Sequence, residues 1–211
     1  AVSLGIWWSW QQHGDQRSKS NQKLTIMLQN KFYPAAEPEK VVFEVVFSEK
    51  EGGGTVDVSG MTVDLPAGSA VGLDNGVYKP IKGAVLVKAI GSSDTSIEIA
   101  KGSGFAKGDN IAFGGKSVAI TAIDTSNADK DVLTVAQFGA EVNVGSKGYQ
   151  AKEVKASDAA PIYTPEFLTG NALVGGTVNN FVRLVNGASV RAVSTALAPE
   201  ILASLKSINL V

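Results

Sequence analysis

Residues 105–135 alternate short runs of β-branched residues with clusters of turn-forming residues, and this alternation limits what the chain can fold into. Val, Ile and Thr favour strands because they fit a pleated, half-buried surface. Gly, Asp and Asn favour the tight turns that separate such strands. Strands are expected at 111–113, 118–123 and 132–135, with turns at 108–109, 114–115 and 124–131. The segment therefore predicts a small antiparallel sheet with one buried face.

The same pattern extends along most of the chain from residue 41 onward. Further strands are expected at 41–47, 56–65, 70–72, 77–80, 84–90 and 95–100. The run 41–47 is apolar almost throughout, which predicts a strand buried on both faces. Asn75-Gly76 and Asn186-Gly187 each lie between strand-like runs, and this dipeptide favours a two-residue hairpin turn.

The C-terminal part adds a loop and the one helix that the sequence predicts. Residues 162–168 follow Pro161 and are expected to pack as a loop. Residues 199–205 are expected to form a helix, because Pro199 suits a first helical turn and the apolar residues 201, 202 and 205 share a face.

Composition supports a mainly β fold. Only 18% of the residues are charged, and the chain contains 23 glycines. The predicted architecture is an antiparallel β-sandwich or barrel body with an inserted small β-module, one short C-terminal helix and an extended N-terminal arm. The expected domains are an arm at 1–34, a body at 35–82 and 151–211, and a central module at 83–150.

The amino-acid inventory offers little for catalysis. The chain has no cysteine, and its one histidine, His13, lies in a polar stretch without a neighbour that would position it. The usual catalytic triads and zinc sites therefore cannot be assembled. The net charge of −1 implies no attraction to nucleic acid, and no apolar run approaches the roughly 20 residues that cross a bilayer. We expect no enzymatic activity, no cofactor, and neither nucleic acid nor a membrane as partner.

Two polar segments are candidate ligand sites. Asp124, Asn127, Asp129 and Asp131 supply oxygen ligands suited to calcium, but their spacing departs from that of an EF-hand loop. A solvated turn is the preferred interpretation, and no metal is expected. The glycines at 102, 104 and 108 hint at a phosphate-binding loop, but they lead into a strand where a helix would be needed. The carboxylates Asp57, Asp64, Glu98 and Glu141 show no pairing pattern typical of a glycosidase.

The N-terminal segment carries all three tryptophans of the chain, Trp7, Trp8 and Trp10. Its basic residues follow the apolar stretch, which is the reverse of a secretory signal. Clustered tryptophans are typical of an anchor in a hydrophobic groove, so these three residues, with Phe32 and Tyr33, are candidate interface residues. The alternative is a leader that precedes the folded protein, since a possible start residue, Met27, lies between this segment and the strand-like part of the chain.

Three parts of the chain resemble the small β-modules of tailed-phage virion proteins. The first is GFAKGDNI followed by ITAIDTSN, the second is DLPAGSAVG with NGVYKPI, and the third is the C-terminal helix after a strand. In this order they resemble head-decoration and head-fibre proteins, over about residues 35–211.

That resemblance implies a structural protein on the outer surface of a phage capsid, bound non-covalently to the major capsid protein as a homo-oligomer, commonly a trimer. The implied function is to decorate and cement the shell. A phage head fibre, or a surface-displayed adhesion module that binds carbohydrate, is the alternative, and a hydrolase ranks third.

Overall fold

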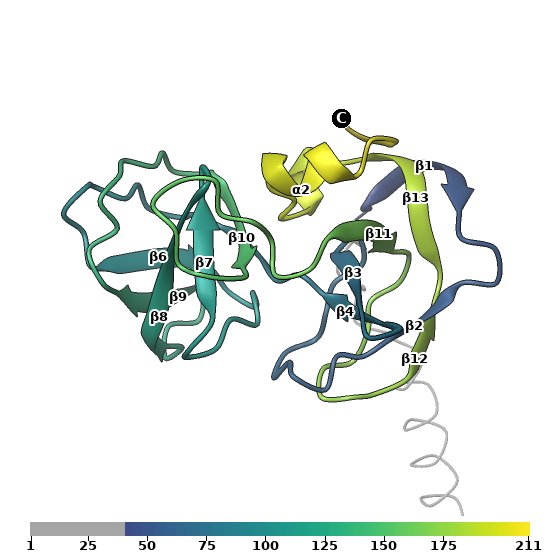
Figure 1. Ribbon diagram of the computed structural model, residues 1–211, viewed down its shortest axis with the longest axis horizontal. Helices are drawn as coiled ribbons and strands as arrows, with labels where there is room; N and C mark the ends of the chain where they lie inside the picture. The colour runs from purple at the N-terminus through teal and green to yellow at the C-terminus, as the bar shows by residue number, and fades with distance from the viewer. Residues whose placement is uncertain (1–40) are drawn as a thin grey trace, which may run out of the picture. The chain divides into compact units, whose positions relative to one another are not determined.

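The computed structural model describes residues 41–211, in which fourteen strands form two curled sheets accompanied by one short α-helix (Figure 1). The protein is mainly β, as the sequence predicts. The larger sheet contains β1 (Phe43–Glu49), β2 (Gly54–Val56), β3 (Ala70–Asp74), β4 (Val77–Pro80), β11 (Pro165–Thr169), β12 (Asn180–Val182), β13 (Leu184–Val190) and β14 (Ile208–Leu210). The smaller contains β5 (Gly83–Val85), β6 (Ser96–Ala100), β7 (Asn110–Phe113), β8 (Lys116–Asp124), β9 (Lys130–Val135) and β10 (Lys147–Ala151).

A long two-stranded ribbon closes the larger sheet. The strand order is β1-β13-β11-β3-β4-β2-β12, and β14 pairs in parallel with β13. The strands β1 and β2 follow one another in the chain, as do β12 and β13, and the pairing runs from Glu49–Val185 on to Gly54–Val182. The β1–β13 ribbon therefore continues as β2–β12. Because β13 pairs with β11 and β2 pairs with β4, the ribbon joins both ends of the sheet into a small barrel.

The ribbon bends at residues 50–53, where specific contacts hold its shape. The Lys50 N–H donates to the Leu184 carbonyl at 2.7 Å. The Lys50 ammonium lies 4.6 Å from the centroid of the Tyr78 ring and donates to the Tyr78 hydroxyl at 2.9 Å. Gly52 and Gly53 have positive φ angles of 69° and 63°, which glycine adopts without steric cost.

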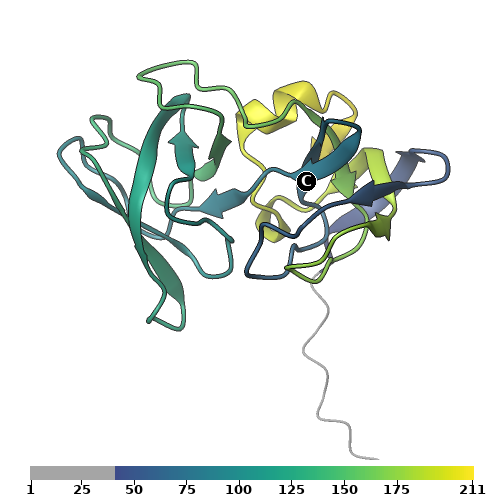
Figure 2. The same cartoon turned by 60° about the horizontal axis from the view of Figure 1, so that its bottom comes forward.

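The smaller sheet also curls until its end strands meet (Figures 1 and 2). Its order is β5-β10-β7-β8-β9-β6. Beyond β5, Leu86 forms a bridge with Ile99 of β6, and the Val87 N–H donates to the Glu98 carbonyl at 3.0 Å. A hydrophobic cluster that includes Phe113, Phe138 and Leu133 fills the inside of this sheet.

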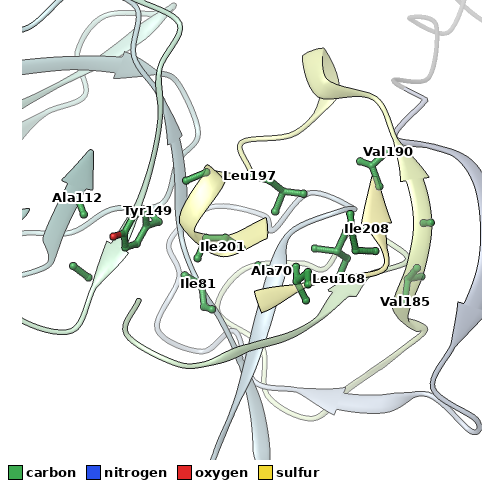
Figure 3. Close-up of a cluster of buried hydrophobic side chains, with 14 of the residues drawn as sticks. Ala70, Ile81, Ala112, Tyr149, Leu168, Val185, Val190, Leu197, Ile201 and Ile208 are labelled. Atoms are coloured by element: carbon green, nitrogen blue, oxygen red, sulfur yellow. The ribbon is translucent and has the colours of Figure 1, made fainter. Parts of the chain in front are cut away.

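One hydrophobic cluster draws residues from both sheets, as Figure 3 shows. Ala112 and Tyr149 come from the smaller sheet, and Leu168 and Val185 come from the larger. The helix α2 (Pro199–Ser204) contributes Ile201 to the same cluster. The expected domains at 35–82 with 151–211 and at 83–150 stay a prediction, because the two sheets share this cluster.

Several of the predicted elements are confirmed. The strands at 70–72, 77–80, 95–100, 111–113, 118–123 and 132–135 correspond to β3, β4, β6, β7, β8 and β9, and the helix at 199–205 corresponds to α2. Asn75 and Gly76 join β3 to β4 with φ angles of 50° and 85°. Positive φ at both central residues is the geometry of a type I′ hairpin turn.

The hairpin predicted at Asn186-Gly187 is wrong, because both residues lie inside the continuous strand β13. Neither has a positive φ. Gly187 is instead required by packing across the ribbon: a Cβ there would lie 2.8 Å from Phe47 Cε2 and 2.8 Å from Ser48 Cβ. In the sequence Gly187 indicates a turn, but in the structure its missing side chain leaves the space that the Phe47 ring occupies.

The strand predicted at 41–47 exists as β1, but the expectation that both its faces are buried is wrong. β1 lies at one end of the strand order, and Val45 and Phe47 are 57% and 58% exposed. Three other expectations also need correction. The strand at 56–65 ends at Val56, the strand at 84–90 is regular only over β5, and residues 165–168 of the expected loop belong to β11.

Replacing Gly187 by alanine should destabilise the protein. The added methyl group must displace the Phe47 ring or the Ser48 Cβ, and overpacking of this kind costs about 1–3 kcal/mol. Urea unfolding followed by circular dichroism measures the change. Gly60→Ala is the control, because a Cβ at Gly60 meets nothing within 4 Å. Equal stability of the two variants would contradict this account of Gly187.

Candidate functional site

The candidate interface residues Trp7, Trp8, Trp10, Phe32 and Tyr33 lie outside the described residues, as does His13. Their roles therefore stay predictions. Within residues 41–211 the candidates are an exposed apolar surface, several polar turns, a hollow beside α2 and a polar joint near the link between the sheets.

The exposed apolar surface lies on the β1–β13 ribbon. Val45 and Phe47 are more than half exposed, and Val41 just before the strand is 47% exposed. The Phe47 ring lies against Gly187 of the neighbouring strand, which supports the ring from one side and leaves much of it open to solvent. Sequence reasoning missed this surface, because a run that is apolar almost throughout is typical of a strand buried on both faces.

An ion pair lies at each end of this apolar surface. Arg191 Nε lies 2.9 Å from Glu44 Oε1 at one end. At the other end Arg183 donates through Nε and Nη2 to Glu49 Oε2, at 2.9 Å and 2.7 Å. An apolar centre with a charged rim is the usual anatomy of a protein interface.

A second group of exposed apolar side chains lies at and before β12. Phe181 is 73% exposed, and Val174 and Val178 are 64% and 59% exposed. Phe181 pairs across the ribbon with Thr55 of β2. The group belongs to a different part of the ribbon from Phe47.

In the acidic turn between β8 and β9, polar side chains accept hydrogen bonds from the backbone of the turn itself. Asp124 Oδ1 accepts from the Ser126 N–H at 2.9 Å, and this bond lowers the pKa of Asp124. Asn127 Oδ1 accepts from the Asp129 N–H at 2.8 Å, and Asp131 forms an ion pair with Lys101 at 2.9 Å. These contacts are those of a polar turn. In the described part of the chain, no group of three or more His, Cys, Asp or Glu side chains is arranged to hold a metal ion.

The glycine-rich segment before β7 makes tight turns. Gly102, Gly104 and Gly108 all have positive φ, between 72° and 95°. The segment continues into β7, so its backbone is presented by a strand and no helix begins there. This arrangement lacks the helix N-terminus with which such loops bind phosphate.

The four carboxylates considered as catalytic groups are not brought together by contacts with one another. Asp57 and Asp64 accept from the N–H groups of Ser59 and Gly175, at 2.9 Å and 3.0 Å. Hydrogen bonds with Ser59 lower the pKa of Asp57, and the Lys130 ammonium lowers the pKa of Glu98. Glu141 lines a hollow. Each of the first three carboxylates thus supports local structure.

That hollow lies beside α2 and has a volume of about 370 Å³. Glu141, Lys116, Lys147 and Glu200 line it together with apolar residues. Lys116 donates to the Gly139 carbonyl at 3.0 Å, and Lys147 donates to the Ala192 carbonyl at 2.6 Å. The two ammonium groups are therefore engaged with the backbone.

The polar joint consists of Lys82, Asp109 and Gln150. Lys82 belongs to the short link between β4 and β5, and its ammonium lies 2.8 Å from Asp109 Oδ2. Gln150 Nε2 donates to Asp109 Oδ1 at 3.0 Å, and the Gln150 N–H donates to the Lys82 carbonyl at 2.8 Å. The side chains of Lys82 and Asp109 are only 9% and 18% exposed. The joint thus fixes the link against β7 and β10.

Tyr149 fastens the return link from β10 to β11. Its ring is buried in the cluster shared by both sheets, and its hydroxyl donates to the Ala159 carbonyl in that link. Burial, together with the nearby Glu200, raises the pKa of Tyr149 to about 12. Tyr149 therefore acts as a neutral structural donor at physiological pH.

Comparison of the chain with models of known protein families, with curated proteins and with solved structures found no match. Among residues 41–211, no helix has the length and apolar character that crossing a membrane requires.

Asp109→Asn should destabilise the protein by about 3 kcal/mol, because it leaves the Lys82 ammonium largely buried without its counter-charge. Equilibrium unfolding in urea measures the loss. Asp74→Asn is the matched control, since it breaks the Asp74–Lys79 pair, whose side chains are 30% and 35% exposed, and it should have a much smaller effect. A loss no larger than that of the control would show that the joint contributes little.

Tyr149→Phe should change how stability depends on alkaline pH. The folded-state pKa of about 12 exceeds the ordinary value of 10, so the unfolded state loses its proton first as pH rises. The stabilisation is complete below pH 10 and is lost between about pH 10 and 12. Urea unfolding at several pH values in this range should show a steeper decline for the wild type than for the variant. Parallel curves would contradict this assignment.

Proposed function

We propose that this chain is a structural protein of a phage particle, which binds the outer surface of the capsid and stabilises the shell through non-covalent contacts with the major capsid protein. The exposed apolar surface around Phe47 is the observation that carries the proposal. Soluble proteins rarely leave such surfaces uncovered, and they commonly mark contacts with other proteins. The order of sequence features shared with head-decoration proteins supplies the class of partner.

The mechanism is mechanical. Two closed sheets that share a hydrophobic cluster and the Lys82–Asp109 joint form a body suited to spanning neighbouring capsid subunits. Each copy opposes expansion or rupture of the shell by the area that it buries, and specific interfaces commonly bury about 1,600 Å² in total. Several copies joined as a homo-oligomer, such as a trimer, add avidity.

The proposed role is non-enzymatic. Asp57, Asp64 and Asp124 accept hydrogen bonds from nearby backbone, and Glu98 is paired with lysines, so these acidic side chains are committed to the fold. This supports a structural role over a hydrolytic one. His13 is the chain's one imidazole, so a native activity abolished by His13→Ala would contradict the proposal.

The alternative is a head fibre or an adhesion module that binds carbohydrate. Such modules present aromatic side chains together on one face, as a platform for sugar rings. Phe47 and Phe181 are the aromatic residues among the exposed large hydrophobic side chains of residues 41–211, and they lie on different strands. This separation favours protein contact over sugar binding.

Labelling the protein on native particles tests the proposal. We expect copies over the whole shell, and we expect bare capsids to rupture at a lower temperature than capsids to which the purified protein has been added. Electron microscopy locates the label, and a thermal release assay for the genome measures the stabilisation. Copies confined to the tail or to a few projecting fibres, with no change in rupture temperature, would favour the alternative.

A further inference from the structure

The chain contains two Asn-Gly dipeptides, Asn75-Gly76 and Asn186-Gly187, and the structure places them in different surroundings. In such a dipeptide the side-chain amide carbon is open to attack by the next backbone nitrogen, because glycine has no side chain to block the approach and its backbone is free to rotate. The attack requires the backbone to rotate until the nitrogen meets the amide carbon. The freedom of the backbone therefore decides which of the two sites reacts.

The first dipeptide is open to solvent. Asn75 and Gly76 form the exposed tip of the β3–β4 hairpin, and a Cβ at Gly76 would meet nothing within 4 Å. The paired residues that flank the tip, Asp74 and Val77, are only partly buried. The Asn75 amide donates an exposed hydrogen bond to Asp74 Oδ1 at 3.1 Å. Little packing therefore opposes rotation of the backbone at this site.

The second dipeptide is held by its backbone, although the Asn186 side chain is exposed as well. Asn186 and Gly187 lie inside β13, and Gly187 pairs with Ser48 of β1. Gly187 is buried, and the Phe47 ring occupies the space beside it. Rotation at this site requires β13 to separate from β1, which would expose buried neighbours such as Ala188. The two sites thus differ in backbone freedom and are alike in the exposure of the asparagine side chain.

We propose that Asn75 is a site of spontaneous deamidation in the folded protein, and that the ribbon protects Asn186 from the same reaction. The Gly76 nitrogen attacks Asn75 Cγ, the new N–Cγ bond closes a succinimide ring, and the Cγ–Nδ2 bond breaks. Nδ2 leaves as ammonia and takes up the proton that the Gly76 nitrogen has lost. Water then adds to either carbonyl carbon of the ring. Opening of one C–N bond gives aspartate, and opening of the other gives isoaspartate.

The reaction changes both the charge and the backbone of the hairpin tip. A new carboxylate appears beside Asp74, whose Oδ2 lies 2.8 Å from the Lys79 ammonium. The aspartate product keeps a suitable turn sequence, since Asp-Gly also favours a type I′ hairpin. The isoaspartate product lengthens the main chain by one methylene group before Gly76. The reaction needs no partner, so it does not depend on the proposed capsid role and can fail separately from it.

Peptide mapping by mass spectrometry, after incubation of the purified full chain at mildly alkaline pH, tests the proposal. The incubation is run in parallel on the native protein and on the chain unfolded in guanidinium chloride. In the native protein we expect Asn75 to react roughly tenfold faster than Asn186 or more, because reaction at Asn186 requires local opening of the ribbon. In the unfolded chain the two rates should approach each other, since both sites then have the same freedom.

Two controls identify the products. Water enriched in heavy oxygen labels the carboxylates that form during the incubation and separates them from deamidation during the digest. Asn75→Asp supplies the reference peptide for the aspartate product, and isoaspartate is recognised by its separate elution and its fragmentation. An Asn75 that stays intact in the native protein would overturn the proposal, whether or not it reacts in the unfolded chain. Equal rates at Asn75 and Asn186 in the native protein would also overturn it.

Discussion

The pairing between the two ends of the described chain is the constraint on which the larger sheet depends. β1 and β2 near residue 50 pair with β13 and β12 near residue 185, and this ribbon connects β11 at one side of the sheet to β4 at the other. Because the paired residues are far apart in sequence, the loss of chain entropy on pairing is large, and the hydrophobic clusters inside the sheet must offset it. Gly187 permits the close approach of the two strands, since Phe47 occupies the space that a side chain would need.

The second organising feature is the way in which the smaller sheet is attached. Two links connect the sheets, and each is fastened by buried or nearly buried polar groups: Lys82 with Asp109 on one, and the Tyr149 hydroxyl on the other. Such contacts are directional, so they define an arrangement where apolar packing alone would tolerate several. The shared cluster around Ile201 adds the apolar contribution. The smaller sheet is therefore held to the larger one by both polar and apolar contacts.

The polar side chains between β8 and β9 hold the turn in which they lie. The residues that make the turn between β8 and β9 look like calcium ligands in the sequence because oxygen ligands and turn-forming residues are the same types. The structure separates the two roles by direction: Asp124 and Asn127 accept hydrogen bonds from the backbone two residues further on. The apolar surface of the ribbon differs from these turns, because Val45 and Phe47 are more than half exposed.

The local sequence by itself determined those elements whose residue pattern lies within the element and its adjoining turns. The hairpin at Asn75-Gly76, the strands of the smaller sheet from Ile97 to Val135 and the helix at Pro199 follow from period-two patterning, turn residues and a proline in the first turn. Tertiary structure decided the rest. The run at 41–47 is equally apolar whether a strand lies in the middle of a sheet or at its edge, and only the strand order shows that Val45 and Phe47 are exposed. Asn186-Gly187 has the composition of a turn, but Gly187 pairs with Ser48 of β1 and the strand β13 continues through both residues. Both outcomes have the same physical reason: burial and backbone pairing depend on residues more than a hundred positions away, and no local pattern records them.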